Sequence, residues 1–140
     1  MPHTTQTYLD YLSLIQQKGI SFETPASQSI DLGGGEHLDI LGPVKQYEDL
    51  NNSSVVFRLV SGQISFLLAG DMEQEAEADL AAAKDLKSTI LKVGHHGSST
   101  SSSAAFLAEV KPSAAVISVG EGNSYALVLM SIARICVGLL

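Results

Sequence analysis

Two adjacent histidines, His95 and His96, stand between glycines at the end of an apolar run, in the stretch KVGHHGSSTSSS. The chain has four histidines in 140 residues, so this pair holds half of its imidazole groups. Imidazole is uncommon in the fully buried interior of a sheet, whereas polar residues in a loop at the end of a strand are often functional. The pair therefore predicts a binding or catalytic site where the strand ends.

Two further apolar runs end in polar residues of the same kind. Asp71 closes ISFLLAGD, and Asn123 lies in GEGNSY after AAVISVG. Because open α/β sheets bind ligands at the carboxyl ends of their strands, these residues and the histidine pair are expected on one rim. Carboxylate and imidazole are ligands that zinc, manganese and iron accept. Asp71, His95 and His96 are therefore predicted metal ligands, although they form only part of a complete ligand set.

Hydrophobic periodicity predicts the elements that position these residues. The predicted strands are EHLDIL, VVFRLV, ISFLLAGD, STILKVG and AAVISVG, and the predicted helices cover 7–18, 72–83 and 103–110. VVFRLV and ISFLLAGD are separated by a turn that contains glycine, which is typical of a hairpin. Strands that alternate with helices after an initial hairpin predict an α/β fold of the α+β type with a mixed sheet.

Structural roles are also available to the same residues. Asp71 precedes a helix, where Asp is a favoured N-cap. The stretch from Ser98 to Ser103 is expected to form a turn that caps the next helix. Glu73 and Glu77 belong to the acidic residues of the 72–83 helix, and such residues usually lie on a solvated face.

Composition limits the class of protein. With 45% hydrophobic and 16% charged residues, the chain fits one globular domain. Its net charge is -7, and no basic run offers a surface that would bind nucleic acid by counterion release. The single Cys136 has no disulfide partner, and the N-terminus lacks the features of a signal peptide. The apolar stretch 126–140 is shorter than the ~20 residues of a membrane span and contains Arg134.

The order of three motifs carries a family resemblance. SSVVFRLVSGQISFLLAGDMEQEAE, then LKVGHHGS, then P..AVISVG..N.Y resemble the metallo-β-lactamase-fold domain of ComEC-type competence proteins, which take part in DNA uptake. The resemblance covers about residues 1–125 and implies the C-terminal portion of an αββα sandwich with a mixed sheet. Residues 126–140 replace the family's Gly-His-Pro continuation with an atypical apolar tail, which suggests a frameshift or a fragment end.

The resemblance also implies a chemistry. The complete domain would hold two divalent metal ions, zinc or manganese, and would hydrolyse a phosphodiester with metal-activated water. Asp71 would be the bridging carboxylate, and either His95 or His96 would be a ligand while the other contacts phosphate, so both are candidate catalytic residues. Ser98, Thr100 and Asn123 are the candidate substrate-binding residues.

The family's main metal motif, His-x-His-x-Asp-His, lies upstream of the matched region. Nothing in this chain has that spacing, and His3 and His37 are isolated. The resemblance therefore implies a fragment that is inactive alone. Its implied partners are single-stranded DNA, the remaining half of the domain and a membrane channel domain, all at the bacterial cell envelope.

Two other functions stay open. In a metal-free hydrolase, Ser98 would be the nucleophile, a neighbouring histidine the base and Asp71 the group that orients it. However, the chain has no Gly-x-Ser-x-Gly elbow. In a non-catalytic remnant, the chain would bind a partner through exposed apolar surface, because half of a sandwich leaves core residues uncovered.

Overall fold

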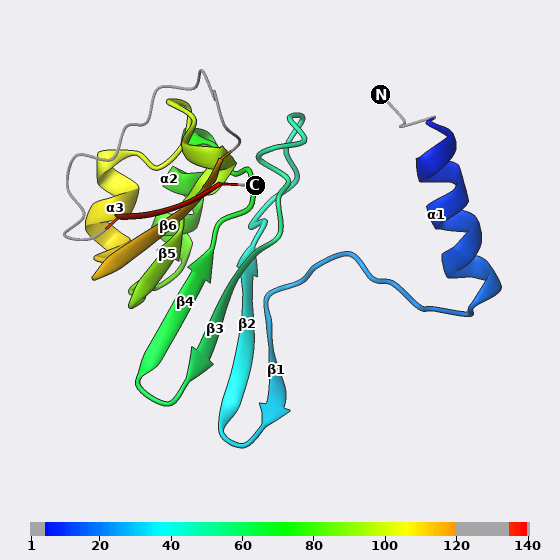
Figure 1. Cartoon of the computed structure of the whole chain (residues 1–140), viewed down its shortest axis with the longest axis horizontal. Helices are drawn as coiled ribbons and strands as arrows, with labels where there is room; N and C mark the ends of the chain where they lie inside the picture. Colours follow the sequence, from blue (N-terminus) through cyan, green and yellow to red (C-terminus); the bar gives the residue numbers. More distant parts are fainter. Residues whose placement is uncertain (1–4, 120–134, 140) are drawn as a thin grey trace.

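The computed structural model describes residues 5–119 and 135–139. In this part of the chain, the strands form one seven-stranded sheet in the order β1-β2-β3-β4-β5-β6-β7 (Figure 1). The strands are β1 Gln28–Gly33, β2 Glu36–Gly42, β3 Val56–Ser61, β4 Ile64–Leu68, β5 Ile90–Lys92, β6 Ala114–Val119 and β7 Ile135–Leu139. The helices are α1 Gln6–Gln17, α2 Gln74–Ala83 and α3 Ala104–Val110, and a 3₁₀ turn, η1, covers Gly94–Gly97.

The sheet is mixed, as expected. Strands β1 to β4 pair antiparallel, whereas β4 to β7 pair parallel. Each of the strands β5 and β6 lies next to the preceding strand, on the same side of it in the sheet. Because connections between parallel strands are right-handed, α2 and α3 lie on the same face of the sheet. The parallel pairing also aligns the carboxyl ends of β4, β5 and β6 at one edge. The α+β fold predicted from the sequence is confirmed.

The core lies between the sheet and the two helices on that face. Leu80 of α2 and Phe106 of α3 are each 1% exposed, and the strand residues Leu67, Leu91 and Ile117 are completely buried. Complete burial of a side chain of this size contributes about 1.5–3 kcal/mol. These contacts fix α2 and α3, and with them the loops that leave β4 and β5.

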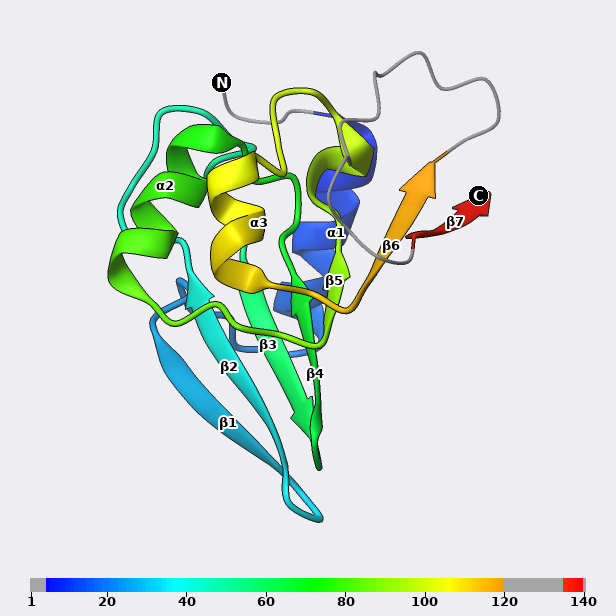
Figure 2. The same ribbon diagram turned by 90° about the vertical axis from the view of Figure 1, so that its left-hand side faces the viewer.

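The opposite face of the sheet has no such cover within the described residues. It carries an open apolar hollow of about 400 Å³, lined by Leu59, Phe66, Leu68, Ile90, Lys92 and Val116. Helix α1 stands apart from the sheet on this side, away from α2 and α3 (Figures 1 and 2). None of its residues is buried, and Leu9 and Leu12 are 46% and 37% exposed.

Three local predictions differ from the structure. No strand was predicted at 28–33, but these residues form edge strand β1, all of whose residues are exposed, so no hydrophobic alternation marks it. Helix α2 begins at Gln74 rather than at Met72, because Asp71 and Met72 belong to the preceding turn. Its N-cap is Glu73, so the N-cap role considered for Asp71 is wrong.

Some predictions fall outside the described residues. Asn123, His3 and the proposed boundary at residue 125 are among them, whereas 135–139 forms β7 next to β6. In the described ranges, no helix combines the length and the apolar character needed to cross a bilayer.

Candidate functional site

Polar side chains gather where β4 and β5 end, and glycines allow their loops to approach closely. Gly70 has φ +60°, and a Cβ built on it would lie 2.7 Å from the Cβ of Ser54. A Cβ on Gly94 would lie 3.3 Å from the carbonyl oxygen of Met72. The two loops are joined directly by the amide of His95, which donates to the carbonyl of Gly70 at 3.0 Å. The convergence inferred from strand ends therefore occurs for these two loops.

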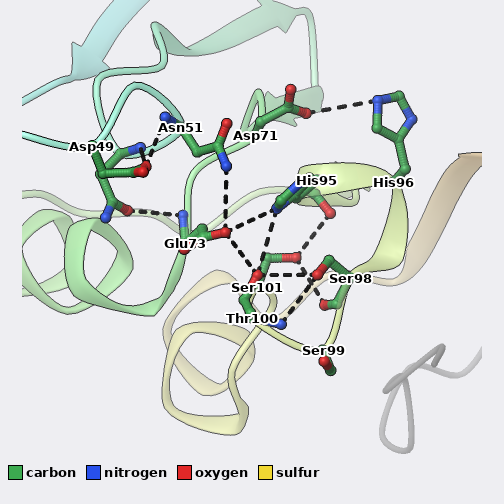
Figure 3. A network of polar contacts seen from close by, with 12 residues as sticks. Asp49, Asn51, Asp71, Glu73, His95, His96, Ser98, Ser99, Thr100 and Ser101 are labelled. Carbon is green, nitrogen blue, oxygen red and sulfur yellow. Dashed lines mark hydrogen bonds and ion pairs between the residues drawn. The ribbon is translucent and has the colours of Figure 1, made fainter. Parts of the chain in front are cut away.

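Asp71 and His96 face each other across this junction (Figure 3). Asp71 Oδ1 lies 3.7 Å from His96 Nε2, and each side chain is 49% exposed. His96 Nδ1 lies 2.8 Å from the carbonyl oxygen of Ser118, which can only accept, so Nδ1 carries a proton. In the neutral ring Nε2 is then an acceptor, so His96 Nε2 and Asp71 Oδ1 are two acceptor atoms that face each other.

This arrangement suits a cation. Asp71 and His96 would hold a divalent ion such as zinc, because carboxylate oxygen and imidazole nitrogen are among its protein ligands. An imidazole whose other nitrogen donates to a backbone carbonyl is also the usual state of a metal-binding histidine. Among residues 5–119 and 135–139, however, no cluster of three or more His, Cys, Asp or Glu side chains could hold a metal. The described residues bring together two potential donors, Asp71 and His96.

His95 faces a different carboxylate. Its Nδ1 lies 3.1 Å from Glu73 Oε1, and the side chains are 22% and 27% exposed. Thr100 Oγ1 donates to the same carboxylate oxygen at 2.9 Å, and Asn51 Nδ2 does so at 3.4 Å. The expectation that Glu73 lies on a solvated helix face is wrong. Its position two residues after Asp71, ahead of the first turn of α2, is the signal that places it in the site.

The histidines have strained backbones. The φ and ψ angles are 43° and 46° at His95 and 51° and 26° at His96, in the left-handed region. This conformation costs roughly 1–2 kcal/mol for each residue with a side chain. Hydrogen bonds hold it, because Ser98 N donates to the carbonyl of His95 at 2.8 Å and Ser101 Oγ donates to that of Gly94 at 2.9 Å. Such strain persists where the surroundings over-determine the backbone, which is common at functional sites.

The hydroxyl-rich loop after the histidines has a structural role. Ser103 is the N-cap of α3 and accepts from the amide of Phe106 at 3.3 Å, so the predicted turn and cap are confirmed. Ser98 is 5% exposed, and its hydroxyl lies 3.0 Å from that of Thr100. Its hydroxyl also accepts from the amide of Thr100 at 3.3 Å, so the hydrogen bonds of the Ser98 side chain support a turn rather than a serine nucleophile. Phosphate binding by Ser98 and Thr100 stays a prediction.

Glu77 clamps the same loop from α2. It is 1% exposed, and its two carboxylate oxygens accept from the amides of Ser102 and Ser103, the latter at 2.9 Å. Burial raises the pKa of Glu77 above its usual range, although these hydrogen bonds act in the opposite direction. The expectation of a solvated face is wrong for Glu77 too. It lies four residues after Glu73 and three before buried Leu80, so helical spacing could have placed it on the inner side.

A second loop, residues 49–54, supports the acidic residues. Asn52 Oδ1 accepts from the amide of Glu73 at 3.0 Å, and Ser54 Oγ accepts from the amide of Asp71 at 3.0 Å. Asp49 Oδ1 in turn accepts from the amides of Asn51 and Asn52. Residue types alone predict only a polar loop for this segment, because hydrogen bonds to backbone amides leave no periodic pattern.

Lys92 ends β5 beside the site, whereas His37 lies at the other end of the sheet, where β2 pairs with the end of β3. Lys92 Nζ donates to the carbonyl of Val93 at 2.9 Å. Burial lowers the pKa of Lys92, and the negative charge of Asp71 acts in the opposite direction. His37 lies on β2, with its Nε2 3.7 Å from Asp39 Oδ2, and is part of another ion pair.

No protein-family model matches the chain. Its sequence is 41% identical over 76 residues to ComE operon protein 3 of Bacillus subtilis, a match of 54% of this chain and 10% of that protein. Competence protein ComA of Neisseria gonorrhoeae is 43% identical over 79 residues, covering 55% and 11%. Recombination protein 2 of Haemophilus influenzae is 40% identical over 92 residues, covering 65% and 12%. The chain spans about a tenth of the length of these curated relatives.

Proposed function

We propose that this chain is part of a metal-dependent hydrolase that cleaves a phosphodiester bond of DNA during its uptake by a bacterial cell. The observation that carries the proposal is the pair of acceptor atoms, Asp71 Oδ1 and His96 Nε2, at 3.7 Å. The similarity to a protein named for competence supports the role in DNA uptake. Single-stranded DNA is the proposed substrate.

The proposed metal is zinc or manganese, and the complete domain is proposed to bind two ions. Asp71 and His96 would hold one ion, with the other ligands supplied by residues outside those described. When bound, such an ion supplies Lewis acidity and a nucleophile at neutral pH. His96 is held for this task by the carbonyl of Ser118, and His95 is held by Glu73. His95 is then the proposed group that contacts the phosphate or moves a proton.

Charge bears on how DNA would reach the site. The chain carries a net charge of -7, so by itself it repels a phosphate backbone. Bound cations would reverse the sign of the electrostatic potential at the edge of the sheet where Asp71 lies, and a partner would supply further positive charge. We therefore expect DNA binding to require metal and the rest of the protein.

The uncovered face of the sheet supports a two-sheet architecture. The hollow lined by Leu59, Phe66 and Leu68 is open, and α1 stands apart on the same side with exposed leucines. A second sheet between them would bury both surfaces, because packed sheets lie about 10 Å apart. We propose that the remaining half of an αββα sandwich fills this space. That half and a membrane channel domain are the proposed partners, and the cell envelope is the proposed location.

A chimera tests the function. The 79 matched residues of Neisseria gonorrhoeae ComA would be replaced by those of this chain, and transformation by added DNA would be counted. Transformation is expected with the unchanged chimera and is expected to be lost with Asp71→Asn or His96→Gln. Glu75→Gln on the exposed side of α2 is the matched control. A chimera that is present at normal levels but does not transform, or an active Asp71→Asn chimera, would contradict the proposal.

A further inference from the structure

We propose that Glu73 is a positioning residue that fixes His95 in the tautomer with its proton on Nδ1. In this tautomer the lone pair of the ring is on Nε2. The catalytic meaning of this role rests on the proposed function, whereas the tautomer itself is a property of the chain alone.

The tautomer follows from the donors and acceptors around Nδ1. Glu73 Oε1 lies 3.1 Å from His95 Nδ1, and Thr100 Oγ1 lies 3.5 Å from it. A hydroxyl has one hydrogen, and that of Thr100 donates to Glu73 Oε1 at 2.9 Å. Both neighbours can therefore only accept from the imidazole. A lone pair on Nδ1 would face two oxygen lone pairs, so Nδ1 carries the proton.

Glu73 is itself held in place for this task. Its amide donates to Asn52 Oδ1 at 3.0 Å, which fixes the backbone. Its Oε1 also accepts from the side-chain Nδ2 of Asn51 at 3.4 Å, so contacts from Asn51, His95 and Thr100 meet on one oxygen (Figure 3). Rotation of the carboxylate would break all three contacts together. The amide of Gln74 donates to the carbonyl of Thr100 at 3.0 Å and keeps the two loops in register.

A carboxylate beside an imidazole affects both its orientation and its tautomer. His95 lies in the 3₁₀ turn after β5 and has a left-handed backbone. A carboxylate on one ring nitrogen orients the ring and increases the basicity of the other nitrogen. The pairing of an imidazole with an orienting carboxylate is the arrangement by which proteins prepare a histidine to accept a proton.

Nuclear magnetic resonance of the metal-free chain tests the proposal. Histidine rings labelled with ¹⁵N are observed by multiple-bond correlation to the ring carbon-bound protons, at a pH where imidazole is neutral. The His95 ring is the one that disappears in His95→Asn, a change that the left-handed backbone tolerates. The unchanged chain and Glu75→Ala, an exposed change in the same helix, are expected to show His95 with protonated Nδ1.

Variants separate Glu73 from its neighbours. Glu73→Ala is expected to lose the single tautomer and to show a mixture, whereas Glu73→Gln keeps an oxygen at Oε1 and is expected to restore it. Thr100→Val leaves Glu73 in place and is expected to keep the proton on His95 Nδ1. This variant shows whether Glu73 or Thr100 fixes the tautomer, even if Glu73→Ala does not fold. A proton on Nε2 in the unchanged chain, an unchanged tautomer in folded Glu73→Ala, or its loss in Thr100→Val would overturn the proposal. Absence of hydrolysis would bear only on the proposed function.

Discussion

Glu77 offers a quantitative test of how the loop that follows the histidines is held. Its carboxylate is 1% exposed and accepts from the amides of Ser102 and Ser103. Glu77→Ala would leave two amides without their acceptor, and each unsatisfied buried donor costs about 1–3 kcal/mol. Removal of a buried carboxylate that resists ionisation offsets part of this cost. The expected loss in the free energy of unfolding is about 2–4 kcal/mol.

Glu77→Gln is a milder change with a different geometry. It keeps one oxygen acceptor but places an amide donor against the second backbone donor, so a loss of about 1–2 kcal/mol is expected. Urea unfolding at neutral pH, followed by circular dichroism, measures both variants. The melting temperature of Glu77→Ala should be roughly 5–15 °C below that of the unchanged chain, given about 2–4 °C per kcal/mol for a chain of this size.

Glu75→Gln is the matched control because it lies on the exposed side of α2. The Glu75 side chain is 63% exposed and pairs with Lys45 at 3.3 Å. An exposed ion pair of this kind contributes little, so the control should stay within about 0.5 kcal/mol of the unchanged chain. If Glu77→Ala lost no more stability than Glu75→Gln, the carboxylate would not clamp the loop and the description of Glu77 would fail.

Three further predictions concern pH, a glycine and the uncovered face. Burial raises the pKa of Glu77 above its ordinary 4.5, so the stability that depends on its protonation is complete below pH 4.5 and is lost as pH rises through the raised pKa, whereas its hydrogen bonds to the loop remain. The difference in the free energy of unfolding between the unchanged chain and Glu77→Gln, measured with urea, should be larger at acidic than at neutral pH, and the opposite trend would refute this sign. Gly70→Ala places a Cβ 2.7 Å from the Cβ of Ser54 and should lower the free energy of unfolding by about 2 kcal/mol or more. Gly62→Ala, at a similar φ, meets nothing within 4 Å and should lower it less in the same urea assay. Equal losses would argue against a close approach at Gly70. Phe66→Ser on the open hollow should lower binding of a hydrophobic dye measured by fluorescence, and undiminished binding would show that the dye reports another surface.

Sequence reasoning was most informative where periodicity was strong. The β3–β4 hairpin, α3 and its serine N-cap follow from alternating or helical apolar spacing and from capping preferences. Asp71 and the histidine pair were predicted as site residues because polar residues interrupt apolar runs at strand ends. Strand β1 was missed because an exposed edge strand has no buried side to mark its period.

The contacts that each residue makes within the site could not be predicted in the same way. Whether His95 or His96 turns toward Asp71 depends on two left-handed residues and on the carbonyl of Ser118, which is distant in sequence. Glu73 and Glu77 look like ordinary helix-surface residues until the loop at 98–103 packs against them. These contacts are set by tertiary packing, for which a local pattern of residue types carries no signal.

The proposal that Asp71 and His96 bind one divalent cation is tested most directly by paramagnetic broadening. Substoichiometric Mn²⁺ would be added to the ¹⁵N-labelled chain, and the loss of amide signals would be followed residue by residue. We predict that the amides of Asp71 and His96 broaden first, that Asp71→Asn abolishes the effect, and that His37→Asn leaves it unchanged. Broadening centred on the exposed Glu75 side of α2, or unaffected by Asp71→Asn, would contradict the proposed cation site.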